Sequence, residues 1–240
     1  MFLDLFPRPK PIMAMLHLKG DNRDDILTRA VREADIYAAG GVDAMIVEDY
    51  YGDSTDVERV LAVLERERPH YIIGVNVLDN FAKSYELAAQ YHAKFMQVDS
   101  VCGHLHPDDE PAYFAMIAGY RRTGAVAVIG GVRFKYQPYL SGRSLADDLA
   151  IGRAHCDAIA VTGAGTGVDT DMQKIHEFRA ILADFPLVIG AGMTVAQVAD
   201  KLAVADAAIV GSTFKDTRKD AGEVSAAHVQ EFMVAVDQIR

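Results

Sequence analysis

The chain has 240 residues, of which 50% are hydrophobic and 24% are charged, a composition typical of a globular protein with a sizeable core. Its formal net charge of -10 argues against nucleic acid or an anionic membrane surface as a partner. No apolar run approaches the length of a membrane span, so we expect no membrane insertion.

The cysteines and the N-terminal segment bear on the compartment. Cys102 and Cys156 have neither metal-ligand spacing nor the number needed for a disulfide framework. Residues 1–7 are too short and too acidic a segment for a signal peptide. Both observations favour a reducing, cytoplasmic location.

Short apolar runs alternate along the first half of the chain with segments of helical periodicity. The runs predict strands at 11–17, 44–47, 71–77 and 94–98, the last ending at Asp99. Helices are expected at 24–39, where Gly40 and Gly41 stop the pattern, then from Ser54, which would cap its helix, and at 80–91 and 110–121.

The same alternation continues through the second half. Gly130 and Gly131 interrupt the fifth apolar run, and we centre that strand on 129–135. Further strands are expected at 158–162, 186–189 and 207–210. Helices are expected at 144–154, capped by Ser144, and at 171–183, 195–204 and 226–239.

Eight strand–helix pairs without a polar linker predict an α/β fold, a single (β/α)8 TIM barrel covering residues 1–240. The length is usual for one such barrel. A doubly wound open sheet is the alternative. The count of eight, and the glycine loops of the seventh and eighth units, favour the barrel.

Glycine-rich segments follow three of the last expected strands. Gly190, Ala191 and Gly192 follow the seventh strand, and Gly211 and Ser212 follow the eighth. Such loops expose backbone N–H groups, and in (β/α)8 barrels a phosphate frequently binds after strands seven and eight. We therefore expect a phosphate-binding site there. The segment 162–167, TGAGTG, adds a third loop but lacks the spacing of a dinucleotide fingerprint.

Catalytic groups in this fold lie at the carboxyl ends of the strands. That rule selects polar residues at 17, 48, 49, 76, 99, 135 and 162. We expect Glu48, Asp99 and Lys135 to carry proton transfer, because enolate chemistry needs a base and a stabilising cation. The expected substrate-binding residues are His17, Asn76, Thr162 and Gly163. Alternatively, His17 only caps its strand, one of Glu48 and Asp49 caps the next segment, and Lys135 forms a salt bridge with Asp99 or Glu48.

A His-x-His pair and several tyrosines leave other ligands open. His104 and His106 have the spacing of a metal dyad, with Asp99 or Glu48 as the third ligand. Most loop histidines are solvated, so we assign no metal and no other cofactor, and keep a divalent metal as the alternative. The tyrosines Tyr50, Tyr51 and Tyr136 would stack on a sugar or base, or would only pack.

Several segments resemble the BtpA/SgcQ family over nearly the whole chain. They are MAMLHL at 13–18, GVDAMIVED at 41–49, GVNVL at 74–78, VTG and TG within 161–167, GAGMT at 190–194 and VGSTFK at 210–215. The resemblance implies a (β/α)8 barrel. It links the namesake to photosystem I accumulation and another branch to a sugar-uptake gene cluster, without a defined catalytic set.

The chain departs from the family pattern at three places. Asp49 stands where members usually have asparagine, and Tyr136 stands where histidine usually follows the lysine of strand five. The proline-rich stretch expected after His17 is missing. These differences indicate a divergent member.

Three functions are compatible with this sequence. The first is an isomerase, epimerase or aldolase-type enzyme acting on a small phosphorylated sugar or related metabolite. The second is a non-catalytic factor that binds a phosphorylated ligand or assembles a complex. The third is an enzyme that processes a nucleoside or phosphoribosyl compound. Barrels of this kind often associate through their outer helices, so a homo-oligomer is also expected.

Overall fold

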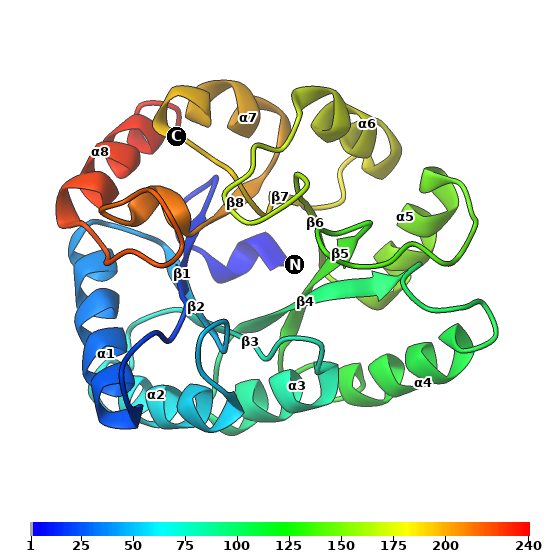
Figure 1. Cartoon of the computed structure of the whole chain (residues 1–240). Helices are drawn as coiled ribbons and strands as arrows, with labels where there is room; N and C mark the ends of the chain where they lie inside the picture. The colour runs from blue at the N-terminus through cyan, green and yellow to red at the C-terminus, as the bar shows by residue number, and fades with distance from the viewer. Residues whose placement is uncertain (1) are drawn as a thin grey trace.

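In the computed structural model, which describes residues 2–240, eight parallel strands close into a barrel inside a ring of helices (Figure 1). Met1, the first residue of the expected domain, lies outside the described residues. The strands are β1 (Ile12–Leu16), β2 (Ala44–Glu48), β3 (Ile73–Asn76), β4 (Phe95–Cys102), β5 (Ala127–Val132), β6 (Ala158–Val161), β7 (Leu187–Ile189) and β8 (Ala207–Val210). The expected (β/α)8 barrel is confirmed, and the open sheet is wrong because β8 pairs with β1.

Each strand is followed by a helix that covers the outside of the barrel. The helices are α1 (Arg23–Ala39), α2 (Ser54–Glu67), α3 (Phe81–Gln90), α4 (Glu110–Arg121), α5 (Leu145–His155), α6 (Met172–Leu182), α7 (Val198–Val204) and α8 (Ala226–Asp237). The expected helix at 195–204 begins instead as a 3-10 turn, Val195–Gln197. Within residues 2–240, no helix is long and apolar enough to cross a bilayer.

The barrel interior is filled by side chains at its amino-terminal end. Phe95, at the start of β4, is fully buried there, and the rings of Phe2 and Phe6 pack against it with centroids 5.9 and 6.0 Å away. Gly74 leaves room for this ring, since a Cβ at that position would lie 2.3 Å from it. With that end packed, a ligand enters only at the carboxyl ends of the strands.

Two strands differ from their expected bounds near the site. β4 continues to Cys102 through a register shift after Val98, so Asp99 lies within the strand rather than at its end. β5 passes straight through its two glycines and ends at Val132, so the expected extension to Lys135 is wrong. Arg133 and Tyr136 have φ angles of 49° and 61°, which turn the chain out of the sheet.

The start of α2 corrects an expected cap. Asp53, not Ser54, is the N-cap, and its carboxylate accepts hydrogen bonds from the N–H groups of Thr55 and Asp56. Asp56 completes a capping box by accepting from the Asp53 N–H. The expected cap Ser144 of α5 is confirmed, and α1 ends at Ala39, directly before Gly40, as expected.

This cap gives a first prediction. Asp53→Ala is expected to lower the free energy of unfolding by about 1 kcal/mol, because two N–H groups at the start of α2 lose their acceptor. Ser54→Ala, the matched control, should change it by less than about 0.5 kcal/mol. Urea unfolding of both variants measures the difference. Equal losses would mean that Asp53 is not the effective cap.

Candidate functional site

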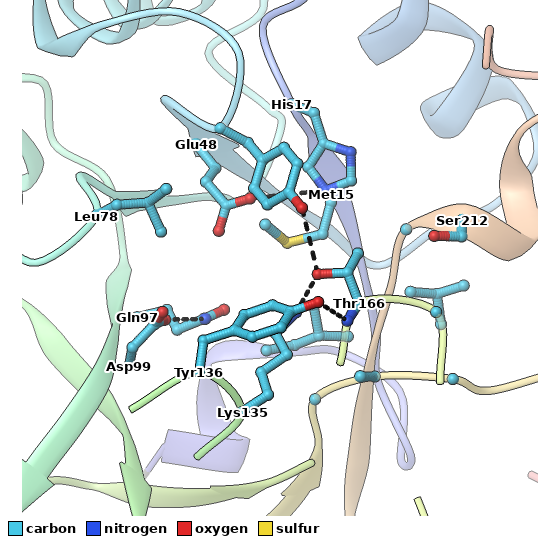
Figure 2. A pocket seen from close by; sticks show the side chains of 18 of the residues that line it. Met15, His17, Glu48, Leu78, Gln97, Asp99, Lys135, Tyr136, Thr166 and Ser212 are labelled. Atoms are coloured by element: carbon cyan, nitrogen blue, oxygen red, sulfur yellow. Dashed lines mark hydrogen bonds and ion pairs between the residues drawn. The ribbon is translucent and has the colours of Figure 1, made fainter. Parts of the chain in front are cut away.

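A cavity of about 220 Å³ opens at the carboxyl ends of the strands. Its walls come from the ends of the strands or from the loops that follow them, and the side chains in Figure 2 converge on it from opposite sides. Nine of the twelve expected catalytic, substrate-binding and phosphate-binding residues line it: His17, Glu48, Asp99, Lys135, Gly190, Ala191, Gly192, Gly211 and Ser212. Asn76, Thr162 and Gly163 do not line it.

Glu48, the last residue of β2, is buried against the cavity floor. The amide Nδ2 of Asn76 donates to Oε1 over 2.8 Å, and Nε2 of His17 lies 3.6 Å from Oε2. Burial is the main cause that raises the pKa of Glu48 to about 8, and the negative charge of Asp99 adds to it. Glu48 is therefore a carboxylic acid at neutral pH, able to donate a proton.

His17 lies just past β1 and is 5% exposed. Burial, with the nearby positive charge of Lys215, lowers the pKa of His17 to about 3. The ring is thus neutral, and its Nδ1 has no hydrogen-bond partner within residues 2–240. Tyr50 packs beside the ring, with centroids 5.1 Å apart. His17 therefore lines the cavity with a neutral imidazole.

Lys135 is held between two loops. Its Nζ donates to Oγ1 of Thr166 over 3.0 Å, and the Thr166 N–H donates to the Tyr136 hydroxyl over 2.9 Å (Figure 2). No carboxylate of the described chain pairs with this ammonium, so the salt bridge expected as its alternative role is wrong. The ammonium keeps two N–H donors for an oxygen in the cavity.

Asp99 and Gln97 project inward from β4. Burial is the main cause that raises the pKa of Asp99 above its ordinary value, while the charge of Lys135 opposes the rise. Nε2 of Gln97 donates to Asp99 over 3.2 Å (Figure 2). Oε1 of Gln97 is buried and has no partner in the described part of the chain. This arrangement leaves an unused acceptor beside Asp99.

Gln97 is absent from the residues expected from the sequence, although a signal exists. Side chains two residues apart in a strand face the same side, so Phe95, Gln97 and Asp99 all point into the barrel. An amide at an inward position of a buried strand is unusual because its polar atoms need partners. That pattern marks Gln97 as a residue of the cavity.

The loops after β7 and β8 provide backbone donors on the other side of the cavity. The N–H of Gly190 is used by the sheet, since it donates to Val161 O over 2.8 Å. By contrast, the N–H groups of Ala191, Gly192, Gly211 and Ser212 donate to no acceptor in residues 2–240. Four unused N–H groups around one cavity can receive an anion such as a phosphate.

Side chains from neighbouring loops fix these donors in place. The Thr213 hydroxyl donates to the carbonyl of Met193, which joins the loop after β8 to the loop after β7. The Thr170 hydroxyl donates to the carbonyl of Ala191 over 3.0 Å. Gly192 has a φ of 67°, a conformation that favours glycine.

The three expected substrate-binding residues that lie outside the cavity support those that line it. Asn76, 1% exposed, neighbours Glu48 in the β2–β3 register and bonds to its carboxyl group. The buried hydroxyl of Thr162 accepts from the backbone N–H of Lys135 over 2.9 Å. A Cβ at Gly163 would lie 2.2 Å from the Asp169 carbonyl, so this glycine lets the loop after β6 fold closely.

The remaining candidates lie elsewhere. Asp49 accepts a hydrogen bond from the Leu78 N–H over 2.9 Å and does not line the cavity. His104 packs edge-on against Tyr113, with ring centroids 5.1 Å apart, and His106 is exposed. Among residues 2–240, no group of three or more His, Cys, Asp or Glu side chains is placed to hold a metal ion.

Known proteins resemble this chain in sequence and in fold. An uncharacterized protein of Pyrococcus abyssi is 27% identical, covering 96% of this chain and 97% of the relative. The photosystem I biogenesis protein BtpA of Synechocystis is 26% identical, covering 88% and 82%. The 3-keto-L-gulonate-6-phosphate decarboxylase of Vibrio cholerae superposes with a TM-score of 0.64 at 14% identity, covering 97% and 100%.

The family follows from the sequence comparison. The resemblance covers the strand ends and glycine loops that line the cavity, as well as the outer helices. The model of the BtpA family matches residues 8–238, and this chain therefore belongs to the BtpA family.

Proposed function

We propose that the protein is an enzyme that transfers protons on a small phosphorylated sugar or a related metabolite. One observation carries this proposal: a protonated, buried Glu48 shares a cavity with Asp99 and Lys135, opposite four unused backbone N–H groups. Paired acids with different proton occupancy are the usual equipment for acid–base catalysis. The N–H groups would hold the phosphate and leave the rest of the ligand over the carboxyl groups.

The residues suit proton transfer next to a carbonyl. Asp99, as the base, would take a proton from the carbon beside the carbonyl. The electron pair of that C–H bond would form the C=C bond of an enolate, and the π pair of the C=O bond would move to the carbonyl oxygen. The ammonium of Lys135 would stabilise the resulting negative charge. Glu48 would then donate its proton to the same carbon in an epimerisation, or to the adjacent carbon of an enediolate in an isomerisation. Isomerisation and epimerisation both use these steps, and carbon–carbon cleavage uses the same enolate.

Among the neighbours in fold, the Vibrio cholerae decarboxylase is named for a sugar phosphate, which agrees with this substrate class. The name of the Synechocystis relative, a photosystem I biogenesis protein, favours instead a factor that binds a ligand or assembles a complex without turnover. If the ligand is instead a phosphoribosyl compound, Tyr50 and Tyr136, which line the cavity, would pack on its base.

A thermal-shift screen of phosphorylated sugars and nucleotides, followed by product analysis with 31P NMR, tests the proposal. A ligand present at about 100 times its Kd should stabilise the fold by about 2.7 kcal/mol. Stabilisation together with a new phosphorylated product supports the enzyme. Stabilisation without a product favours the binding factor, and no stabilisation by any phosphate compound contradicts both.

A lysine variant tests the assignment of Lys135. With a substrate from the screen, Lys135→Met is expected to lower turnover about 100-fold, because the cavity loses the cation that faces the developing oxyanion. Lys94→Met removes an exposed lysine outside the cavity and should leave turnover unchanged. Steady-state kinetics of both variants gives the comparison. Unchanged turnover in Lys135→Met would remove Lys135 from the mechanism.

A further inference from the structure

A second cavity adjoins the candidate site, beside β4 and under the first turn of α3. Its volume is about 380 Å³, and we call this cavity, enclosed by Ala82, His104, Tyr113 and Met116, the side chamber. Asp79, Asp99 and Gln137 line both the side chamber and the main cavity. The two spaces are therefore neighbours that share a wall, and one of the expected catalytic side chains stands in that wall.

The volumes indicate that the two spaces act together. Small-molecule sites usually measure roughly 300–1,000 Å³, and the main cavity, at about 220 Å³, falls below that range. The side chamber brings the pair within it. The wall between them includes a hydrogen bond from Nε2 of Gln137 to Asp79, 3.1 Å long and exposed. A bond of this kind exchanges readily with water and with a ligand.

The walls of the side chamber have the chemistry of an aromatic-ring site. Phe81, Tyr113 and Met116 provide two rings and a thioether, all of which pack well on a flat ring. His104 lies edge-on to Tyr113 at an interplanar angle of 76°. Its Nδ1 is buried without a partner in the described residues, and the His104 ring itself lines the side chamber.

The charges of the lining restrict which ring fits. Asp79 and Asp99 are carboxyl groups, and no lysine or arginine lines the side chamber within residues 2–240. A ring that carries a carboxylate would meet like charge there, whereas a ring with N–H donors would find acceptors.

We propose that the side chamber binds a neutral or cationic nitrogen heteroaromatic ring, which the substrate carries in addition to its phosphate. The inference rests on the proposed function and makes its substrate class more specific: a two-part ligand with phosphate at the loops after β7 and β8. The ring then lies beyond Asp99, so that the bond between the two parts passes the carboxyl groups of Asp99 and Glu48.

Benzimidazole, a two-ring nitrogen heterocycle, is the probe. We expect saturable binding in an NMR titration, with the imidazole signals of His104 shifting and those of exposed His106 unchanged. Anthranilate, which carries a carboxylate, should bind at least about fivefold more weakly. Ala82→Trp fills the chamber and should weaken benzimidazole binding at least about tenfold, whereas Ala82→Ser, the matched control, should stay within about twofold.

The outcomes separate the two proposals. The proposed ring site is contradicted if benzimidazole binding does not saturate, or if the NMR signals of His104 and His106 shift alike. It is also contradicted if folded Ala82→Trp binds benzimidazole as tightly as Ala82→Ser does. Should Ala82→Trp fail to fold, Met116→Trp with Met116→Leu as control repeats the comparison. Inorganic phosphate is titrated in parallel. If the native chain binds benzimidazole but does not bind inorganic phosphate, the result contradicts the proposed function and supports the ring site.

Discussion

Glu48→Gln is expected to make the protein more stable above neutral pH while lowering turnover by about 10²- to 10⁴-fold. The gain in stability follows from burial, since the folded chain holds this carboxyl group where its charged form is poorly solvated. Glutamine has nearly the same shape and keeps an oxygen for the Asn76 amide, but it never has to ionise.

The direction of the pH dependence follows from the pKa values. The pKa of Glu48 rises from its ordinary value of 4.5 to about 8 on folding, so its contribution to stability is full below pH 4.5 and is lost as the pH rises through 8. His17 acts in the opposite direction: its pKa falls from 6.5 to about 3, and stability is lost as the pH falls through that interval. Above pH 6.5 the Glu48 effect therefore dominates.

Urea unfolding at pH 5 and pH 9 measures this effect. Relative to the native chain, Glu48→Gln should gain on the order of 3–5 kcal/mol between the two pH values, at about 1.4 kcal/mol per pKa unit. Glu177→Gln, a control at an exposed glutamate, should show the same difference from the native chain at both. If Glu48→Gln also shows no pH-dependent difference, the folded chain does not raise the pKa of Glu48.

The barrel could be predicted because its strands are buried on both faces. Parallel strands of this kind appear in the sequence as apolar runs, and β8 matches its expected bounds at both ends. Among the helices, α4 also matches its expected bounds at both ends. The glycine loops after β7 and β8 could be predicted for a similar reason, because glycine indicates the backbone geometry of a loop directly. Glu48 could be selected from the sequence because catalytic groups of this fold lie at the carboxyl ends of the strands.

The site could not be predicted where long-range pairing decides the structure. The expected fourth strand covered residues 94–98, yet pairing with β5 carries β4 on to Cys102, beyond the register shift. Asp99 therefore lies within β4, on the same face of the strand as Gln97. Lys135 reaches the cavity from a loop with two left-handed residues, which a strand pattern does not show.

Position at a strand end also does not tell which way a side chain points. Asn76 and Thr162 end or follow strands as Glu48 does, yet both bond to neighbouring residues rather than lining the cavity. Lys215 is a similar case. It belongs to the segment that contains Gly211, but its Nζ pairs with Glu33 of α1 over 3.0 Å, outside the cavity.

Gly192→Ala is expected to lower the free energy of unfolding by about 3 kcal/mol or more and to abolish binding of inorganic phosphate. A left-handed conformation costs a non-glycine residue about 1–2 kcal/mol. Here the added Cβ would also lie 2.1 Å from the carbonyl oxygen of Val168 and 2.4 Å from its carbonyl carbon. These are backbone atoms, so relief requires the loop to move, and the Gly192 N–H moves with it.

Gly142→Ala is the matched control, because Gly142 has nearly the same φ, 66°, but no atom within 4 Å of the added Cβ. Gly142→Ala should lower the free energy of unfolding only by the cost of the left-handed conformation, about 1–2 kcal/mol, and should keep phosphate binding. Urea unfolding and a phosphate titration of both variants separate backbone strain from steric conflict. Equal losses of stability would show that the loop after β7 yields to a methyl group, and retained phosphate binding in Gly192→Ala would place the anion on other donors.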